Sequence, residues 1–205
     1  MEKIKVSEIF ESIQGEGRYA GYPMLFIRLS GCTRACWYCD TKYHTKGVEM
    51  EIDGLIKIIK DSKLPYVCWT GGEPLLQREQ IKKVKEKTRE YYHHIETNGD
   101  LLEKTDFYLF HYLAVSPKIK EVARRVKKLC LEFNPDIWDI KVVTDLDKIG
   151  VDMIPFATML MPLNTGEIKK DKEIEQKVWQ YCIEKNLRYS PRLQVTVWEL
   201  KKRGK

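Results

Sequence analysis

The sequence predicts an α/β fold, in the form of a compact, open and partial barrel of the (βα)6 type. Two observations carry this prediction: short apolar or β-branched runs recur along the chain, and amphipathic stretches lie between many of them. Such alternation is typical of βαβ units that build a parallel sheet. About six units are too few for a closed eight-stranded barrel. The 205 residues suit a single core domain spanning 1–205.

The expected strands mostly end in Gly, Ser, Thr, Asn or Pro, which favour turns. They are residues 24–31 (MLFIRLSG), 65–72 (PYVCWTGG), 93–99 (HHIETNG), 112–118 (YLAVSPK), 138–144 (WDIKVVT) and 154–163 (IPFATMLMPL). The expected helices are residues 51–63, 78–92, 118–133 and 170–186. In the last of these, Ile174, Val178, Tyr181 and Cys182 fall at helical spacing.

The composition indicates a globular protein without a membrane segment. Hydrophobic residues make up 43% of the chain and charged residues 32%, and no apolar run is long enough to span a bilayer. The first residues lack the apolar stretch of a signal peptide, so the cytoplasm is the expected location. Thiols stay reduced in that compartment, so the six cysteines indicate a metal site or catalysis before disulfides.

The formal net charge of +6 comes from lysines that are scattered along the chain and mixed with acidic residues. Nucleic-acid binding would require a concentrated basic stripe. The densest basic stretch, residues 118–128, reads as the exposed face of a helix. We therefore expect no direct nucleic-acid partner.

Five of the expected strands end in short polar or small-residue motifs. These are GCTRACWYCDT, TGGEP, ETNG, SPK and MPL, at the ends of the first, second, third, fourth and sixth strands. In α/β proteins, ligands bind at the carboxyl ends of the strands. The sequence therefore predicts a site assembled on one rim from separate loops.

Three cysteines with the spacing C-x3-C-x2-C, namely Cys32, Cys36 and Cys39, form the most informative motif. One interpretation is a zinc site completed by His44 or by a distant residue, because Cys3His sites exist. The other is a [4Fe–4S] cluster, for which thiolates are the usual ligands. Three thiolates leave the fourth iron open for a small molecule, which explains why the motif stops at three.

The cysteine motif, with Tyr38 at its aromatic position, resembles the signature of the radical S-adenosylmethionine (SAM) superfamily. TGGEP resembles the GGE motif of the same superfamily. The resemblance implies a complete or partial (βα) barrel with a [4Fe–4S] cluster on its rim. It also implies that the amino and carboxylate groups of SAM bind the open iron, and that the reduced cluster cleaves SAM to methionine and a 5′-deoxyadenosyl radical. The side chains would position SAM, not react. The SAM-binding residues implied are Tyr38, Cys39, Asp40, Gly72, Glu73, Ser116, Pro117 and Lys118, with Glu73 either accepting from the amino group or supporting the turn.

Six further motifs, in this order along the chain, resemble the 7-carboxy-7-deazaguanine synthase family. They are ESIQGEG, GYPMLFIRLSGC, CDT, TGGEPLLQ, IETNG and SPK. The resemblance implies conversion of 6-carboxy-5,6,7,8-tetrahydropterin to 7-carboxy-7-deazaguanine with loss of ammonia, a step toward queuosine and related deazapurines. It further implies catalytic use of SAM, a requirement for Mg2+ with Thr41 as its ligand, a homodimer, and an electron donor such as flavodoxin or ferredoxin.

The same resemblance assigns the substrate-binding residues, and their chemistry suits a flat heterocycle with a carboxylate. They are Ile13, Gln14, Gly15, Glu16, Arg28 and Thr70. The amide of Gln14 can bond a planar edge, and Arg28 can fork a carboxylate. An alternative for Arg28 is a strand residue paired with a surface acid.

The last residues of the chain depart from the family pattern. In the stretch 189–205, Arg192 and Gln194 match an R-L-Q-x-H tail, but Thr196 replaces the usual histidine. A contact between the tail and the substrate is therefore not carried over. Two alternative functions stay open on the sequence: a radical SAM activase for a glycyl-radical partner enzyme, and a non-catalytic zinc-binding module.

Overall fold

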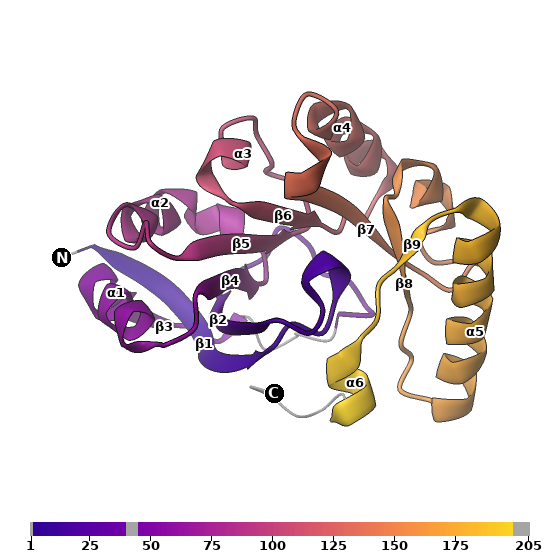
Figure 1. The fold of residues 1–205 in the computed structure, drawn as a ribbon, viewed down its shortest axis with the longest axis horizontal. Helices are drawn as coiled ribbons and strands as arrows, with labels where there is room; N and C mark the ends of the chain where they lie inside the picture. The colour runs from indigo at the N-terminus through magenta and orange to yellow at the C-terminus, as the bar shows by residue number, and fades with distance from the viewer. Residues whose placement is uncertain (1, 40–44, 199–205) are drawn as a thin grey trace.

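A computed structural model describes residues 2–39 and 45–198 of the chain. The described residues form one nine-stranded sheet in the order β3-β1-β2-β4-β5-β6-β7-β8-β9 (Figure 1). From β2 to β9 all neighbours are parallel, and β1 is antiparallel to both β2 and β3. The strands are β1 (Lys3–Ile13), β2 (Pro23–Leu29), β3 (Val48–Glu51), β4 (Tyr66–Gly71), β5 (Tyr92–Thr97), β6 (Tyr112–Val115), β7 (Trp138–Thr144), β8 (Met159–Pro162) and β9 (Arg188–Tyr189).

The six predicted strands are confirmed as β2, β4, β5, β6, β7 and β8, and they run parallel as expected. The sixth is shorter than the predicted 154–163, because residues 154–156 lie in a 3-10 helix and β8 begins at Met159. The sheet is open, because its edges are β3 and β9. These strands are nearly continuous apolar runs because helices cover one face of the sheet and the other face lines the barrel interior. Trp69 on β4, Leu113 on β6 and Val142 on β7 are fully buried.

Strands β1, β3 and β9 were not predicted. In β1, the buried Ile4 and Val6 alternate with the exposed Lys3 and Lys5, as expected for a strand that is buried on one face only. Charged residues interrupt the apolar pattern of β1, so its eleven residues do not form the continuous apolar run that is typical of a buried strand. The β1–β2 hairpin brings the loop after Ile13 to the open side of the barrel (Figure 1).

Four helices confirm the predicted ones: α1 (Ile52–Asp61), α2 (Arg78–Glu86), α4 (Lys120–Cys130) and α5 (Ile168–Lys185). The helices α1, α2 and α4 are shorter than predicted, α2 most of all, whereas α5 begins before its predicted start. The remaining crossovers use the short helix α3 (Asp106–Leu109) and the 3-10 helix η5 (Val151–Phe156). Figure 1 shows α1 to α5 along the outer side of the curved sheet, and α6 (Leu193–Val197) at its open side. Within the described residues, no helix has the length and apolar character needed to cross a membrane.

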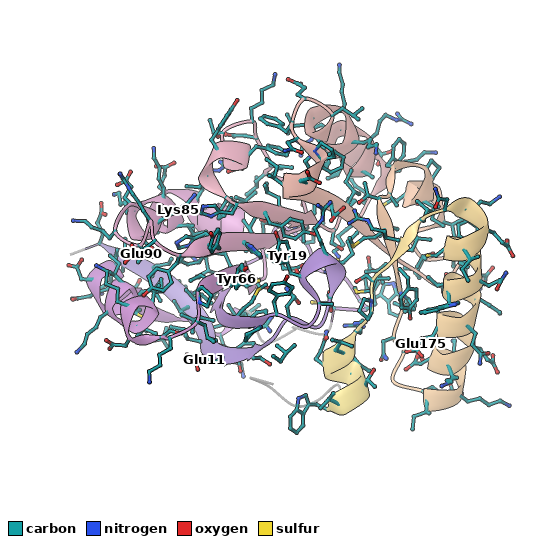
Figure 2. The ribbon with its side chains drawn as sticks, in the orientation of Figure 1. Glu11, Tyr19, Tyr66, Lys85, Glu90 and Glu175 are labelled. Carbon is teal, nitrogen blue, oxygen red and sulfur yellow. The ribbon has the colours of Figure 1, made fainter. Side chains whose placement is uncertain are left out.

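An aromatic cluster fills the inner side of the sheet below the strand ends. Tyr19, on the 3-10 helix η1 (Gly17–Tyr19), packs against His94 of β5 and Tyr112 of β6, with ring centroids 4.3 Å and 4.8 Å apart. Tyr66 of β4 also packs against this histidine, with ring centroids 5.4 Å apart, and lies close to Tyr19 (Figure 2). The β1–β2 loop is therefore anchored, through Tyr19, on the inner side of β5 and β6.

Unfolding free energy is expected to fall between pH 6.5 and pH 4.5, because two histidines are buried in their neutral form. Burial lowers the pKa of His93 to about 4 and that of His94 to about 3. When folding lowers the pKa of a histidine, the folded protein has its full stability above the pKa of the unfolded state, about 6.5. The unfolded state binds more protons below that pH, so the unfolding free energy falls as pH falls. Urea unfolding across this range measures the slope.

The matched control is His94→Phe, which keeps the aromatic packing and removes one titrating group. The slope of unfolding free energy against pH should be smaller in this variant than in the parent, by up to about 1.4 kcal/mol per pH unit. Burial raises the pKa of Glu73 and of Glu96, and these groups act in the opposite direction in both proteins. Equal slopes for the two proteins would contradict the prediction.

Candidate active site

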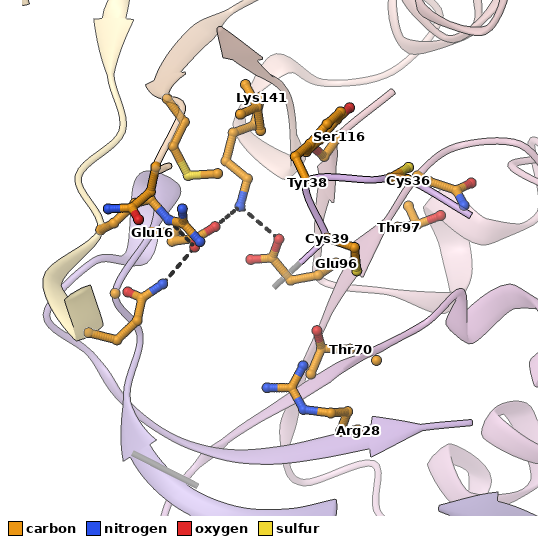
Figure 3. Close-up of a pocket in the computed structure, with 18 of the residues that line it drawn as sticks. Glu16, Arg28, Cys36, Tyr38, Cys39, Thr70, Glu96, Thr97, Ser116 and Lys141 are labelled. Carbon is orange, nitrogen blue, oxygen red and sulfur yellow. Dashed lines mark hydrogen bonds and ion pairs between the residues drawn. The ribbon is translucent and has the colours of Figure 1, made fainter. Parts of the chain in front are cut away.

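A cavity of about 300 Å³ lies at the carboxyl ends of the parallel strands. It joins the cysteine loop after β2, the turn after β4, the ends of β5 and β6, and the loop after β1 (Figure 3). The predicted site residues that line it are Ile13, Gln14, Gly15, Glu16, Arg28, Cys32, Cys36, Tyr38, Cys39, Thr70, Gly72, Ser116 and Lys118. Glu73 and Pro117 are not among the lining residues. Asp40, Thr41 and His44 lie outside the described residues, so their roles stay predictions.

The start of the cysteine loop is fixed to the end of β5 by Asp100. The carboxylate of Asp100 accepts two hydrogen bonds from Arg34, both of 2.7 Å, and one of 2.6 Å from Thr33 Oγ1. Asn98 Nδ2 donates to Thr33 Oγ1 at 2.9 Å. These contacts hold Cys32 at the cavity wall independently of any bound group.

The three cysteines of the motif are free thiols that line the same cavity, so the donor set fits a thiolate-bound cluster. The backbone N–H of Arg34 points at Cys32 Sγ, at 3.4 Å, and N–H donors stabilise a thiolate. Among the described residues, no three Cys, His, Asp or Glu side chains gather around one point as ligands of a single ion. The cysteines that hold a [4Fe–4S] cluster each bind a different iron, so they need not surround one common metal position.

Tyr38 stands beside the thiols at the edge of the cavity. Burial, together with Cys36 and Cys39, raises its pKa to about 12, so the phenol stays protonated. Its ring meets that of Trp37 edge to face at 5.4 Å, and Trp37 is 69% exposed. Tyr38 lines the cavity beside the cysteines, whereas Trp37 faces solvent.

The Gly71–Gly72 turn docks against the end of β2. Gly72 N donates to Leu29 O at 3.2 Å, and Glu73 N donates to Gly31 O at 2.8 Å. A Cβ on Gly72 would lie 1.8 Å from Gly31 O, which no side chain can tolerate. The absence of a side chain therefore allows the turn to touch the backbone that precedes Cys32.

Glu73 is fully buried behind the cavity wall. Its carboxylate accepts from Leu75 N at 3.0 Å, from Thr97 Oγ1 at 2.7 Å and from Asn98 N at 2.7 Å. Burial raises its pKa despite these bonds. Of the two roles expected for Glu73, the geometry favours support: the carboxylate ties the GGE turn to the end of β5 and does not face the cavity.

The ends of β6 and of the neighbouring strand supply the opposite wall. Ser116 N donates to Thr97 O at 2.7 Å and extends the parallel ladder to the rim. Lys118 Nζ donates to Ser116 Oγ at 3.0 Å. These two side chains face the cavity, while Pro117 between them sets the chain direction.

Arg28 and Thr70 are register partners on β2 and β4, so their side chains point to the same face of the sheet. Both line the cavity. Arg28 Nε also pairs with Glu8 Oε2 of β1 at 3.2 Å. The structure thus combines the two expectations for Arg28, a paired strand residue and a cavity residue.

Lys141 is the main cavity residue that the sequence did not reveal. It is 2% exposed in the middle of β7, and its Nζ pairs with Glu16 Oε2 at 2.6 Å and with Glu96 Oε2 at 2.9 Å (Figure 3). Burial alone would lower the pKa of Lys141, but the two carboxylates outweigh it and raise that pKa. The available signal was a lysine between the apolar residues Ile140 and Val142 of a predicted strand.

The two carboxylates differ in their protonation. Burial would raise the pKa of Glu16, but Lys141 and Arg192 outweigh it and hold that pKa at about 2. Burial dominates at Glu96 and raises its pKa. Carboxylates whose environments shift their pKa values in opposite directions are suited to different roles.

The segment after β9 closes the cavity on the side of the β1–β2 loop. Gln194 Nε2 donates to Glu16 Oε1 at 2.7 Å, and Leu193 N donates to Gly15 O at 3.0 Å. Gly17 N donates to Ser190 Oγ at 2.8 Å. Arg192 and Gln194 were recognised in the sequence, but their contact with Glu16 was not predicted.

Comparisons with known proteins place the chain. The family model described as the radical SAM superfamily matches residues 26–173. A 7-carboxy-7-deazaguanine synthase of Pyrobaculum aerophilum is 32% identical over 96% of this chain and 95% of its own length. The chain belongs to the 7-carboxy-7-deazaguanine synthase family of radical SAM proteins. Membership confirms the resemblance of the motifs and disfavours the activase and zinc-module alternatives.

Other relatives of the family agree with this assignment. The 7-carboxy-7-deazaguanine synthase of Halobacterium salinarum is 30% identical over 95% of this chain and 90% of its own. That of Thermoplasma acidophilum is 52% identical over a shorter stretch, 39% of each protein. The crystal structure of QueE from Escherichia coli has the same fold, with a TM-score of 0.57 at 18% identity over 92% of this chain and 93% of that one. Membership of the superfamily implies a [4Fe–4S] cluster and SAM as cofactors.

Proposed function

We propose that this chain converts 6-carboxy-5,6,7,8-tetrahydropterin to 7-carboxy-7-deazaguanine with loss of ammonia. The observation that carries the proposal is the composition of one cavity. Three thiols line one of its walls, and the SIQGEG loop, Arg28, Glu96 and Lys141 line the other. A cofactor bound at the cysteines would therefore meet a substrate bound by carboxylates, amides and cations.

When bound, the cluster and SAM supply a 5′-deoxyadenosyl radical that abstracts a hydrogen atom from the substrate. The side chains of Cys32, Cys36 and Cys39 would hold the cluster. The backbone of Gly72, the side chains of Ser116 and Lys118 and the Tyr38 edge would orient SAM. This division leaves the residues of the β1–β2 loop for the substrate.

On the substrate side, the chain offers groups that match a flat, donor-rich ring with a carboxylate. Arg28 and Thr70 would hold the carboxylate by charge-assisted and hydroxyl hydrogen bonds. Gln14 and Glu96, which are joined by a 3.2 Å hydrogen bond, would face the amide and amino edge of the ring. Glu96, paired with Lys141 at 2.9 Å, would act there as a hydrogen-bond acceptor.

The further components follow the family expectation as parts of this proposal. Mg2+ would be held by Thr41 and mainly by oxygens of the substrate and water, because Mg2+ keeps several such ligands. Asp40 would contact SAM. A homodimer, an electron donor such as flavodoxin or ferredoxin, and a reducing compartment such as the cytoplasm complete the proposal, since the cluster thiolates require reducing conditions.

Anaerobically reconstituted protein with SAM, dithionite, Mg2+ and the carboxytetrahydropterin is expected to form 7-carboxy-7-deazaguanine, measured by liquid chromatography and mass spectrometry. Because SAM is regenerated in the proposed cycle, product should exceed 5′-deoxyadenosine by many turnovers. The control omits the pterin and should show slow SAM cleavage. Protein with full iron and sulfide content that forms no product would disprove the assignment.

A further inference from the structure

The ammonium group of Lys141 occupies an unusual position for a lysine. Its neighbours on β7, Ile140 and Val142, are completely buried, and the lysine side chain is itself 2% exposed. A buried charge is costly unless it is paired and hydrogen-bonded. Here the partners are two carboxylates of the cavity wall, Glu16 and Glu96, at 2.6 Å and 2.9 Å.

These two carboxylates belong to separate parts of the molecule. Glu16 follows β1, and its second oxygen accepts from Gln194 at 2.7 Å and faces Arg192 Nε at 3.4 Å. Glu96 lies on β5, and its second oxygen accepts from Gln14 at 3.2 Å. Lys141 is thus the central member of a continuous set of contacts from the C-terminal segment to the substrate-facing edge of β5 (Figure 3).

Resting on the proposed function, we propose that Lys141 is a positioning residue that keeps Glu96 ionised and aimed at the substrate, and that links this state to the docking of residues 190–198 on Glu16. Two carboxylates that share a site repel each other, and one of them takes up a proton unless a cation lies between them. Lys141 is that cation. The substrate therefore meets an acceptor at Glu96 only while the ammonium bridges both carboxylates.

Few other groups compete for control of Glu96. The titratable and charged groups that face it are Lys141, Glu16, Lys118, Cys68 and Tyr112. Burial raises the pKa of Cys68 and of Tyr112, so both are neutral at physiological pH. Among the described residues, Lys141 is the ion-pair partner of Glu96. Replacing Lys141 should therefore change the pH dependence of substrate binding.

The test is Lys141→Met in the reconstituted enzyme, with kcat and KM for the pterin measured from pH 5.5 to pH 9. The acid limb of kcat/KM is expected to move up by at least about one pH unit, and KM at pH 7 to rise on the order of tenfold or more, with a smaller change in kcat. Calorimetric titration of pterin into protein without SAM should show the same weakening, independently of turnover.

A double variant separates charge balance from packing. Lys141→Met with Glu16→Gln removes one cation and one carboxylate together, so its acid limb should return toward that of the parent enzyme. If Lys141 only filled space, the losses of the two single variants would add. Lys141→Arg keeps the charge and should retain the parental pH profile. If Lys141→Met does not fold, the double variant and the arginine variant decide.

The matched control breaks a buried ion pair outside the cavity. Arg78 pairs with the fully buried Asp106 at 2.8 Å, and neither residue lines the cavity. Arg78→Met should lower the melting temperature and leave KM and the pH profile unchanged. An unchanged profile in Lys141→Met, or additive losses in the double variant, would overturn the proposal. Failure of the parent protein to form product would instead overturn the proposed function.

Discussion

Replacing Cys36 with alanine is expected to eliminate the iron–sulfur centre and to lower product formation by more than about 100-fold, because the loss of a residue that only supports a metal ligand already costs 10–100-fold. Cys36 lines the cavity on the exposed side of the cysteine loop. Anaerobic purification followed by iron and sulfide analysis measures the first effect, and the product assay measures the second.

Cys130→Ala is the matched control, because Cys130, the last residue of α4, is buried in the core and does not line the cavity. This variant should bind as much iron as the parent and lose about 1–2 kcal/mol of unfolding free energy through a small core cavity. Parental iron content in Cys36→Ala, or iron loss in Cys130→Ala, would contradict the assignment of the cluster ligands.

Gly72→Ala is expected to destabilise the protein by about 3 kcal/mol and to reduce its iron content. A Cβ at this position would lie 1.8 Å from Gly31 O and 3.0 Å from Cys32 Cβ. The contacted backbone atoms cannot move aside without displacing the cysteine loop. The loss of unfolding free energy should therefore lie at the upper end of the range of about 1–3 kcal/mol that is typical of overpacking. Urea unfolding and iron analysis measure the two effects on one preparation.

Gly54→Ala provides the comparison for this prediction. Gly54 lies in α1, and the nearest atom to a new Cβ is Met50 Cγ at 4.0 Å. Alanine is the better helix former, so this variant should gain up to about 1 kcal/mol. If Gly72→Ala unfolded at the same urea concentration as the parent with full iron content, the close contact of the turn and the cluster loop would be refuted.

The parallel part of the fold could be predicted from the sequence because each strand is buried on both faces and reads as an apolar run. The same reasoning failed for β1, where one face packs on the core and the other carries Lys3, Lys5 and Glu8. It also did not distinguish a crossover with a full helix from one with the four residues of α3. A short helix lacks the repeated apolar spacing that identifies a long one.

The rim position of the site residues could be predicted, because strand ends and motif order are local properties. The contacts among them could not. Lys141 is adjacent to neither Glu16 nor Glu96 in sequence, and the three meet only through the curvature of the sheet and the path of the β1–β2 loop. For the same reason, the sequence left two roles open for Glu73, contact with SAM and support of the turn, and the bonds from Thr97 and Asn98 to its carboxylate favour the second.

The seam between the β1–β2 loop and the C-terminal segment has a consequence for the order of synthesis. Glu16 and Gln194 are 178 positions apart, and Gly17 and Ser190 are 173 apart. The cysteines, the GGE turn and Lys118 all emerge from the ribosome before the segment that completes the wall beside Glu16. The cysteine side of the cavity can therefore assemble on a nascent chain before the segment that supports Glu16 has been made.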